Sequence, residues 1–269
     1  MLLTGLNYIG SSLSEKTADT FQAFNPATDT YLPEKFSRAS ELELLKAIAL
    51  AENAFKIFRV TSPSGKASFL DAIAAEILAL GDSLIDRCAL ESGLTTARIT
   101  GERDRTCGQL KLFAQLVRDG WWVEARIDKA ILTRSPVRPD IRRMLMPVGP
   151  VAVFGASNFP LAFSTAGGDT ASTLAAGCPV IVKAHPSHPG TNEMVASAII
   201  QAAQTTGMPE GIFSCLQLSN EDALKLVSHR SIKAVGFTGS KTAGMLLFNA
   251  AAKRPDPIPV FAEMSSVNP

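Results

Sequence analysis

The chain lacks the features that mark several classes of protein. Its 26 basic and 25 acidic residues leave a net charge of +1, without the basic excess of a nucleic-acid-binding protein. It contains no apolar run of about 18 residues, the length that crosses a membrane. It also lacks a basic segment followed by an apolar stretch near its start, so no secretory signal is predicted. We therefore expect neither a nucleic-acid partner nor a membrane partner.

Cysteine is scarce and irregularly spaced. The four cysteines, Cys88, Cys107, Cys178 and Cys215, form no CxxC pair. This spacing favours neither a metal site nor a disulfide framework. Each cysteine is interpreted as a small buried hydrophobic side chain, because none stands in a motif typical of a reactive thiol. A reducing, cytoplasmic location agrees with this usage.

What is present is a 269-residue chain that is 46% hydrophobic, enough for a sizeable core. Residues 40–120 have the pattern of four helices. Ser40 and Glu43 form a capping box before an apolar face that repeats every three or four residues. Ser62, followed by Pro63, begins the second helix, and two more are predicted over residues 82–93 and 95–119. Before these helices, residues 21–33 predict two short strands with a turn between them.

From about residue 140, short apolar segments alternate with helical ones. The apolar segments are VAVFGA, PVIVKA, IFSCLQL, IKAVGFTG and PVFAEM. Such alternation predicts βαβ units and a largely parallel sheet. The first intervening helix is expected over residues 164–176. The predicted fold class is therefore α/β, with a Rossmann-like parallel sheet in residues 140–269. A helical segment, residues 1–139, precedes this sheet and packs with it.

Ligands of open α/β sheets bind beyond the carboxyl ends of the strands, so residues there are candidates for a site. Lys183 ends one strand, where its ammonium group needs a ribose hydroxyl, a phosphate or a carboxylate as a partner. Gly239 and Ser240 begin a helix and form a potential anion site, although Ser240 is also explained as an ordinary N-cap. Asn158 can donate to a developing oxyanion or stabilise its own turn. No GxGxxG follows the first strand, so the usual dinucleotide motif is absent.

Motifs in a fixed order connect these candidates. They are NPAT at residues 25–28, GASNFPL at 155–161, LAAGCPVIVKAHPSHPGT at 174–191, GMPEGIFS at 207–214, FTGS at 237–240 and FAEMSSVNP at 261–269. Together they resemble the aldehyde dehydrogenases along nearly the whole chain. The variants GASNFPLAFS and KAHPSHPGT look most like the bacterial branch that oxidises 2-oxoglutarate semialdehyde (2,5-dioxopentanoate). A branch that oxidises long-chain fatty aldehydes looks similar.

The resemblance implies a catalytic cycle. A cysteine thiolate would attack the aldehyde, and the side-chain amide of Asn158 would hold the oxyanion of the thiohemiacetal. Hydride would pass to the nicotinamide, and Glu263 would activate the water that hydrolyses the remaining thioester. The strand that carries Glu263 reads as buried, and burial would make its carboxyl group hold a proton more tightly, as suits a base near neutral pH.

The resemblance also implies a cofactor site. Lys183 would contact the adenosine ribose, and Ser240 would contact the pyrophosphate. The residues expected to bind the cofactor are Gly155, Ala156, Ser157, Lys183, His185, Ser187, Gly239 and Ser240.

One departure from the family's pattern bears on the cofactor. Many NAD-using members carry a Glu three residues after the cofactor-binding Lys, where it binds the ribose 2′-hydroxyl. Pro186 stands at that position in this chain. No acidic group there would repel a 2′-phosphate, and Lys183, His185 and Ser187 offer groups that attract one. NADP is therefore expected as the cofactor in preference to NAD.

Two other departures bear on catalysis. Ser-Ser stands at residues 265–266, where Gly-Gly is usual after the Glu, and this affects the pose of Glu263. The family's nucleophilic cysteine lies farther along the chain than the Glu. None of the four cysteines stands in a motif that replaces it.

Two hypotheses follow. In the first, the chain is the N-terminal half of an NADP-dependent aldehyde dehydrogenase, left by an incomplete reading frame, a truncation or a split chain, and is inactive alone. In the second, it is a natural short protein that only binds nucleotide or assembles with full-length relatives. Residues 124–136, which read as a strand, would mediate assembly, because the family uses such a segment between subunits. The resemblance also implies a small aldehyde as substrate and a homo-oligomer for the parent protein.

Overall fold

The computed structural model describes residues 2–265. Its helices are α1 (Glu41–Phe58), α2 (Pro63–Ala79), α3 (Gly81–Ser92), α4 (Thr96–Asp119), α5 (Gly168–Ala175), α6 (Pro189–Thr205), α7 (Asn220–Ser228) and α8 (Lys241–Ala252). Its strands are β1 (Tyr8–Ile9), β2 (Ser12–Leu13), β3 (Thr20–Asn25), β4 (Thr30–Ser37), β5 (Arg126–Asp128), β6 (Ile141–Arg143), β7 (Val151–Phe154), β8 (Val180–Lys183), β9 (Phe213–Leu216), β10 (Ala234–Gly239) and β11 (Val260–Met264). None of these helices combines the length and the apolar character needed to cross a membrane.

Seven strands form one sheet in the order β11-β10-β7-β8-β9-β1-β2. The five strands from β11 to β9 run parallel, which confirms the predicted α/β class. At the other edge, β1 and β2 extend the sheet as an antiparallel pair, with Tyr8 opposite Cys215. Two-residue strands carry no measurable periodicity, so the sequence alone gives no sign of this pair.

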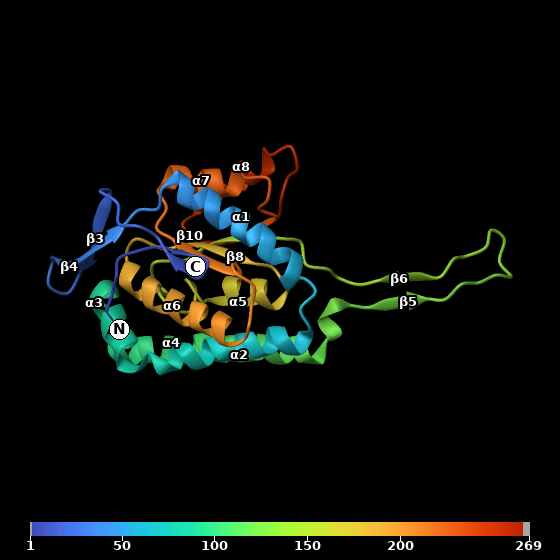
Figure 1. Cartoon of the computed structure of the whole chain (residues 1–269), viewed down its shortest axis with the longest axis horizontal. Coiled ribbons are helices and arrows are strands. Elements are labelled where there is room, and N and C mark those ends of the chain that lie inside the picture. The colour runs from blue at the N-terminus through green and yellow to red at the C-terminus, as the bar shows by residue number, and fades with distance from the viewer. Residues whose placement is uncertain (1, 266–269) are drawn as a thin grey trace, which may run out of the picture.

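Helices cover both faces of the sheet (Figure 1). Side chains alternate along each strand, so Val153 and Val182 belong to one buried cluster while Ala152 and Ile181 belong to another. The first cluster includes residues of α2 to α6, and the second includes residues of α1, α7 and α8. Burial on both faces explains why the central strands read as continuous apolar runs.

Most predicted helix starts are confirmed. The Ser40 hydroxyl accepts from the Glu43 amide while the Glu43 carboxyl accepts from the Ser40 amide, the reciprocal pattern of a capping box. The Ser62 hydroxyl caps α2 at the Gly65 amide. The start predicted at residue 164 is wrong, because α5 begins only at Gly168. Residues 155–167 instead form a loop closed by its own backbone hydrogen bonds, which we call the β7–α5 loop.

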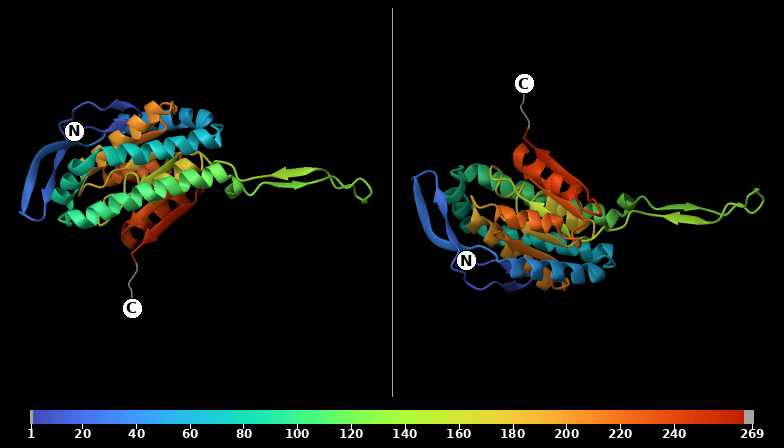
Figure 2. Two further views of the ribbon diagram at one scale, coloured as in Figure 1. Left: turned by 90° about the horizontal axis from the view of Figure 1, so that it is seen from below. Right: turned by 90° about the horizontal axis from the view of Figure 1, so that it is seen from above.

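Strands β5 and β6 form a hairpin that projects from the body of the protein (Figures 1 and 2). Every residue of the two strands is exposed, including Ile127 at 64% and Ile141 at 48%. A two-stranded hairpin with apolar side chains in water is only marginally stable without a further surface to pack on. The strand predicted within residues 124–136 is present as β5, part of an arm that the described residues leave uncovered.

The last strand differs from its prediction. The segment around Glu263 reads as a buried strand, yet β11 is the edge strand of the sheet and three of its five residues are exposed. Phe261 is 67% exposed. The misprediction has a physical cause. The apolar composition of a strand favours burial, but it does not show whether other described residues pack against that strand. Of the Ser-Ser pair at 265–266, Ser265 is the last described residue and the second serine lies outside the described residues.

Candidate functional site

The order of the parallel strands creates a switch point between β7 and β10. The chain proceeds from β7 to β8 and β9 on one side, then returns to place β10 and β11 on the other. Phe154 at the end of β7 lies opposite Lys183 of β8 and Phe237 of β10. The segments that follow these three strands therefore leave the sheet side by side. In open α/β sheets this crevice is where ligands bind.

The β7–α5 loop approaches the sheet closely at Gly155. A Cβ added there would lie 2.6 Å from the Cα of Ser164, so only glycine fits without a shift. The buried Ala156 donates its amide to the carbonyl of Phe163 at 2.8 Å. Ser157 and Asn158, which follow, are exposed at the surface of the loop. The start of the loop, at Gly155 and Ala156, is therefore closely packed, whereas the side chains of Ser157 and Asn158 face solvent.

Lys183 and His185 follow β8. Burial lowers the pKa of the Lys183 ammonium, and the positive charge of nearby Arg38 lowers it further. Burial, with His188 and Lys183 as neighbours, lowers the pKa of His185 to about 3. The His185 ring is therefore neutral near pH 7 and can accept a hydrogen bond. Its Nδ1 already accepts from the amide of the exposed Ser187 at 3.2 Å.

Two residues that were not singled out in the sequence connect these loops. His188 is 1% exposed, and its Nε2 lies 3.1 Å from the carbonyl oxygen of Ala156. Asn192 accepts from the hydroxyls of Ser164 and Thr165 and donates its amide to the carbonyl of His185 at 2.9 Å. Both residues stand at the start of α6. The repeated His-Pro pair in HPSHP was a visible signal for His188, whereas Asn192 had none.

His188 also contains an unsatisfied atom. Its Nδ1 is buried and has no hydrogen-bond partner among the described residues. Burial lowers the pKa of His188, against the opposing effect of its hydrogen bond with Ala156. The ring therefore acts as a neutral connection between the segments after β7 and β8.

At the end of β10, Gly239 and Ser240 lead into α8. The Ser240 hydroxyl accepts from the Ala243 amide at 3.3 Å, so Ser240 is an N-cap, as its simpler interpretation predicts. The carbonyl of Gly239 accepts from the Ser265 amide at 3.2 Å. The first amide groups of a helix have no intrahelical acceptors, and the helix dipole favours an anion there. The start of α8 is thus compatible with both roles.

Glu263 lies across from Thr238 in the β10–β11 pair and is exposed. It shares a face of the sheet with Thr238 and Gly236. On that face, Asp169 of α5 packs so closely that a Cβ added at Gly236 would lie 3.0 Å from that of Asp169. Burial raises the pKa of Asp169 and the charge of Glu263 raises it further, while a hydrogen bond with Thr238 lowers it. A second carboxyl group therefore lies beside the candidate base.

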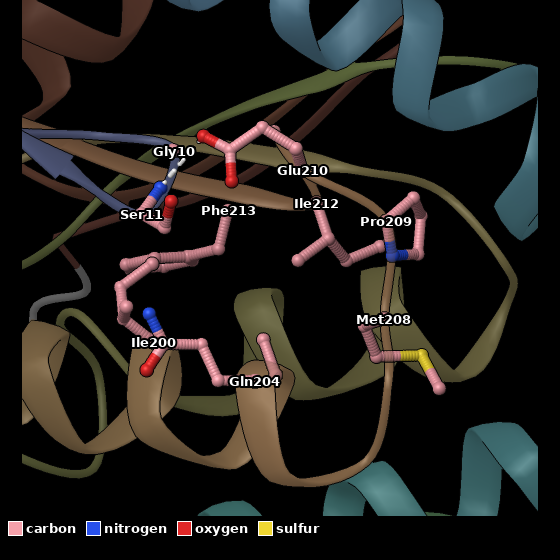
Figure 3. Close-up of a pocket in the computed structure, with 11 residues that line it drawn as sticks. Gly10, Ser11, Ile200, Gln204, Met208, Pro209, Glu210, Ile212 and Phe213 are labelled. Atoms are coloured by element: carbon pink, nitrogen blue, oxygen red, sulfur yellow. Dashed lines mark hydrogen bonds between the residues drawn. The ribbon is translucent and has the colours of Figure 1, made fainter.

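Two hollows of the protein lie away from these loops. One is a cavity of about 30 Å³, lined by Ile200, Met208 and Phe213 among others (Figure 3). Beside it, Glu210 accepts from the Ser11 amide at 2.9 Å. A more open hollow of about 470 Å³ lies between residues 3–5, 16–20 and 34–37. Within residues 2–265, no group of three or more His, Cys, Asp or Glu side chains is arranged to hold a metal ion.

Comparison with known proteins gives three findings. The profile of the aldehyde dehydrogenase family matches residues 13–269. The alpha-ketoglutaric semialdehyde dehydrogenase 2 of Azospirillum brasilense is 52% identical over 100% of this chain and 52% of its own length. The alpha-ketoglutaric semialdehyde dehydrogenase of Acinetobacter baylyi is 49% identical over 98% of this chain and 50% of its own. The chain therefore spans about half the length of the curated relatives it matches.

A solved structure agrees with the fold. The 1-pyrroline-5-carboxylate dehydrogenase from Thermus with bound NAD superposes with a TM-score of 0.85 at 20% identity. The likeness covers 97% of this chain and 49% of that one. At this identity the superposition shows the fold alone.

Proposed function

The chain belongs to the aldehyde dehydrogenase family, and we propose that it supplies the nucleotide site, the oxyanion donor and the general base of an enzyme that oxidises an aldehyde with NADP. The observation that carries the proposal is the switch point, where the segments after β7, β8 and β10 leave the sheet side by side. We further propose that residues 140–269 form the nucleotide-binding part and residues 1–139 its cover.

The residues at the switch point fit a nicotinamide nucleotide. Lys183 has no carboxylate within 4.0 Å among the described residues, so its ammonium group is available to a ribose or phosphate oxygen. The start of α8 at Ser240 would receive the pyrophosphate. Gly155, Ala156 and Ser157 would line the approach, with His185, Ser187 and Gly239 around it. When bound, the nucleotide supplies the hydride acceptor.

Two side chains of this chain are proposed to take part in the reaction, one as oxyanion donor and one as general base. The amide of Asn158 would donate to the oxygen of the aldehyde as negative charge develops on it. Glu263 would take a proton from the water that releases the acid product. The exposure of both side chains leaves them open to a substrate and to the half of the enzyme that the relatives carry beyond this chain.

The nucleophile is not among the four cysteines. All four are buried, and burial raises the pKa of each thiol, to about 12 for Cys88 and Cys215. A nucleophilic cysteine needs the opposite, an accessible thiolate with a lowered pKa. We therefore propose that the nucleophile belongs to the half that the relatives carry beyond this chain. We call a protein in which this chain is continued by that half the complete enzyme.

The buried thiols also favour a second function for the chain alone, namely binding nucleotide without oxidising aldehyde. Purified chain mixed with aldehyde and NADP is then expected to form no NADPH. Robust NADPH formation would refute this assignment of the cysteines.

We also propose a cytoplasmic location for the protein, and its four free cysteines support this proposal.

We propose NADP in preference to NAD because Pro186, not an acidic residue, stands beside His185 and Ser187. Replacing Pro186 by Glu adds a carboxylate that repels a 2′-phosphate and accepts from a 2′-hydroxyl. In the complete enzyme, Pro186→Glu is expected to lower kcat/KM for NADP by about 10-fold or more and to raise it for NAD. Steady-state kinetics with both cofactors measures this. An unmodified enzyme that prefers NAD would contradict the proposal. Pro186→Gln, which adds a side chain of similar size without the charge, serves as the control.

The proposed substrate is 2,5-dioxopentanoate, which would yield 2-oxoglutarate. The support is the identity of 52% and 49% to two alpha-ketoglutaric semialdehyde dehydrogenases along nearly the whole chain. The same kinetic assay tests this choice against a long-chain fatty aldehyde. A higher kcat/KM for the fatty aldehyde would assign the chain to the other branch.

We also propose that the arm formed by β5 and β6 joins copies of the protein into a homo-oligomer. The support is its exposed apolar side chains, including Leu132 at 76% and Val137 at 55%. Replacing residues 126–143 by a short Gly-Ser turn is expected to convert the oligomer to a monomer in light-scattering measurements. A particle of unchanged mass would reject this role.

A further inference from the structure

Helix α4 presents a polar stripe to the β7–α5 loop. Arg98, Glu102, Arg105 and Gln109 are spaced by four, three and four residues, so they lie on one face of the helix. Each of them meets the loop or its junction with α5. Gln109 lies farthest along, where a Cβ added at Gly168 would be 3.3 Å from its Nε2. Arg98 and Arg105 are exposed and Gln109 is half-buried, whereas Glu102 is buried. A buried carboxyl group is unusual in a helix whose other buried residues are mainly apolar.

Glu102 makes the closest of these contacts. It is 5% exposed, and its Oε1 accepts from the amides of Leu161 and Ala162 at 2.8 and 3.0 Å. Two consecutive amides can converge on one oxygen only if the backbone between them is locally turned. The second oxygen, Oε2, is buried with no hydrogen-bond partner among the described residues. Both hydrogen bonds that the Glu102 side chain makes with the described residues therefore go to the loop.

Arg98, one turn earlier on α4, holds the loop on the other side of these amides. Its Nη2 donates to the carbonyl of Asn158 at 3.2 Å, and its guanidinium group lies 4.8 Å from the centroid of the Phe159 ring. Phe159 packs edge-on against Phe163, with ring centroids 5.1 Å apart. Arg105 lies over the Phe163 ring at 4.9 Å. Helix α4 therefore contacts the loop at the Asn158 carbonyl and at the residues that follow it.

We propose that Glu102 is a positioning residue. By fixing the backbone at Leu161 and Ala162, three and four residues after Asn158, it determines the orientation of the Asn158 side-chain amide. This proposal rests on the proposed function of Asn158 as oxyanion donor. An oxyanion donor is effective only when its position is fixed before charge develops, and a misplacement of about 1 Å costs up to about 100-fold in rate. The β7–α5 loop has no regular secondary structure, so its rigidity depends on its own backbone hydrogen bonds and on contacts with α6 and α4. Of these, the contacts of α4 lie nearest to Asn158 on its C-terminal side.

Glu193 provides a matched comparison, because it is also a buried carboxyl group that accepts hydrogen bonds from two consecutive backbone amides. It is 4% exposed and accepts from the amides of Thr4 and Gly5 at 2.6 and 2.9 Å, tying the N-terminal segment to α6. If Glu102 matters only for holding the fold together, replacing either carboxyl group should have the same consequences. If Glu102 acts through Asn158, only its replacement should change the catalytic rate.

The experiment is a double-mutant cycle in the complete enzyme with Glu102→Gln and Asn158→Ala. Glutamine keeps the volume and one acceptor oxygen but makes both hydrogen bonds neutral, which about halves their strength. We expect Glu102→Gln to lower kcat by about 10-fold in the unmodified background and not at all in the Asn158→Ala background. The dissociation constant of NADPH and the kcat of Glu193→Gln should remain within about 2-fold of the unmodified enzyme.

Two results would overturn the proposal: equal loss of kcat in both backgrounds, or no loss in either. Hydrogen exchange in the chain itself supplies a readout besides activity. The amides of Leu161 and Ala162 should exchange about 10-fold faster in Glu102→Gln, and unchanged exchange would show that Glu102 does not hold the loop. If Asn158→Ala alone leaves kcat unchanged while exchange accelerates, the role proposed for Asn158 fails, and with it the catalytic part of the role of Glu102.

Discussion

Replacing Glu263 by glutamine in the complete enzyme is expected to lower kcat by about 1,000-fold while leaving the first turnover of NADPH formation intact. Glutamine is nearly isosteric but cannot take a proton from water. In the proposed cycle, formation of NADPH precedes the step that needs this base, so one equivalent should still appear rapidly. Stopped-flow absorbance of NADPH after mixing with aldehyde separates the rapid equivalent from the slow steady state.

The neighbouring carboxyl group of Asp169 provides the control for this experiment. Asp169 lies beside Glu263 and has a pKa raised by burial and by the charge of Glu263. Asp169→Asn removes a carboxyl group that packs on the same face of the sheet, without removing the proposed base. Its steady-state rate should exceed that of Glu263→Gln by a wide margin. Loss of the rapid equivalent in Glu263→Gln would mean that Glu263 acts before hydride transfer, contrary to our assignment.

Replacing Asn158 by alanine is expected to lower kcat by about 100- to 1,000-fold, the usual cost of removing one oxyanion donor. The side chain is exposed and its backbone is held by Arg98, so truncation should leave the loop in place. The dissociation constant of NADPH should therefore change little. Single-turnover kinetics should place the loss in NADPH formation, because the donor acts when the aldehyde oxygen becomes negative.

Ser157 is the comparison residue, since it precedes Asn158 in the same loop and is likewise exposed. Because Ser157 is proposed to contact the cofactor and not the aldehyde, Ser157→Ala should retain most of the kcat measured at saturating NADP. A drop in NADPH affinity without a drop in kcat for Asn158→Ala would reassign that residue from the reaction to cofactor binding.

The sequence predicted the parts of the fold that depend on local pattern. Continuous apolar strands between amphipathic helices predicted the parallel sheet, and Ser40 with Glu43 predicted the start of α1. The strand ends that a ligand would meet followed from the general geometry of parallel sheets, so Lys183 and Ser240 were placed correctly at one edge. These features need only a few neighbouring residues to specify them.

Features that depend on distant contacts were not predictable. The hydrogen bonds of Glu102 to Leu161 and Ala162 join residues about 60 positions apart, and no local pattern reports them. Asn192 likewise reaches back to Ser164 across the strand between them. The burial of β11 was mispredicted for a related reason, because an edge strand differs from a central strand only in what lies beside it.

The central claim is that the segments after β7, β8 and β10 form one site for NADP. Isothermal titration of the chain with NADPH tests it most directly, because binding does not require the nucleophile. We predict one site per chain, weaker binding of NADH, and a loss of about 10-fold or more in NADPH affinity for Lys183→Ala. Absence of NADPH binding by the folded chain, or binding that Lys183→Ala leaves unchanged, would contradict the account.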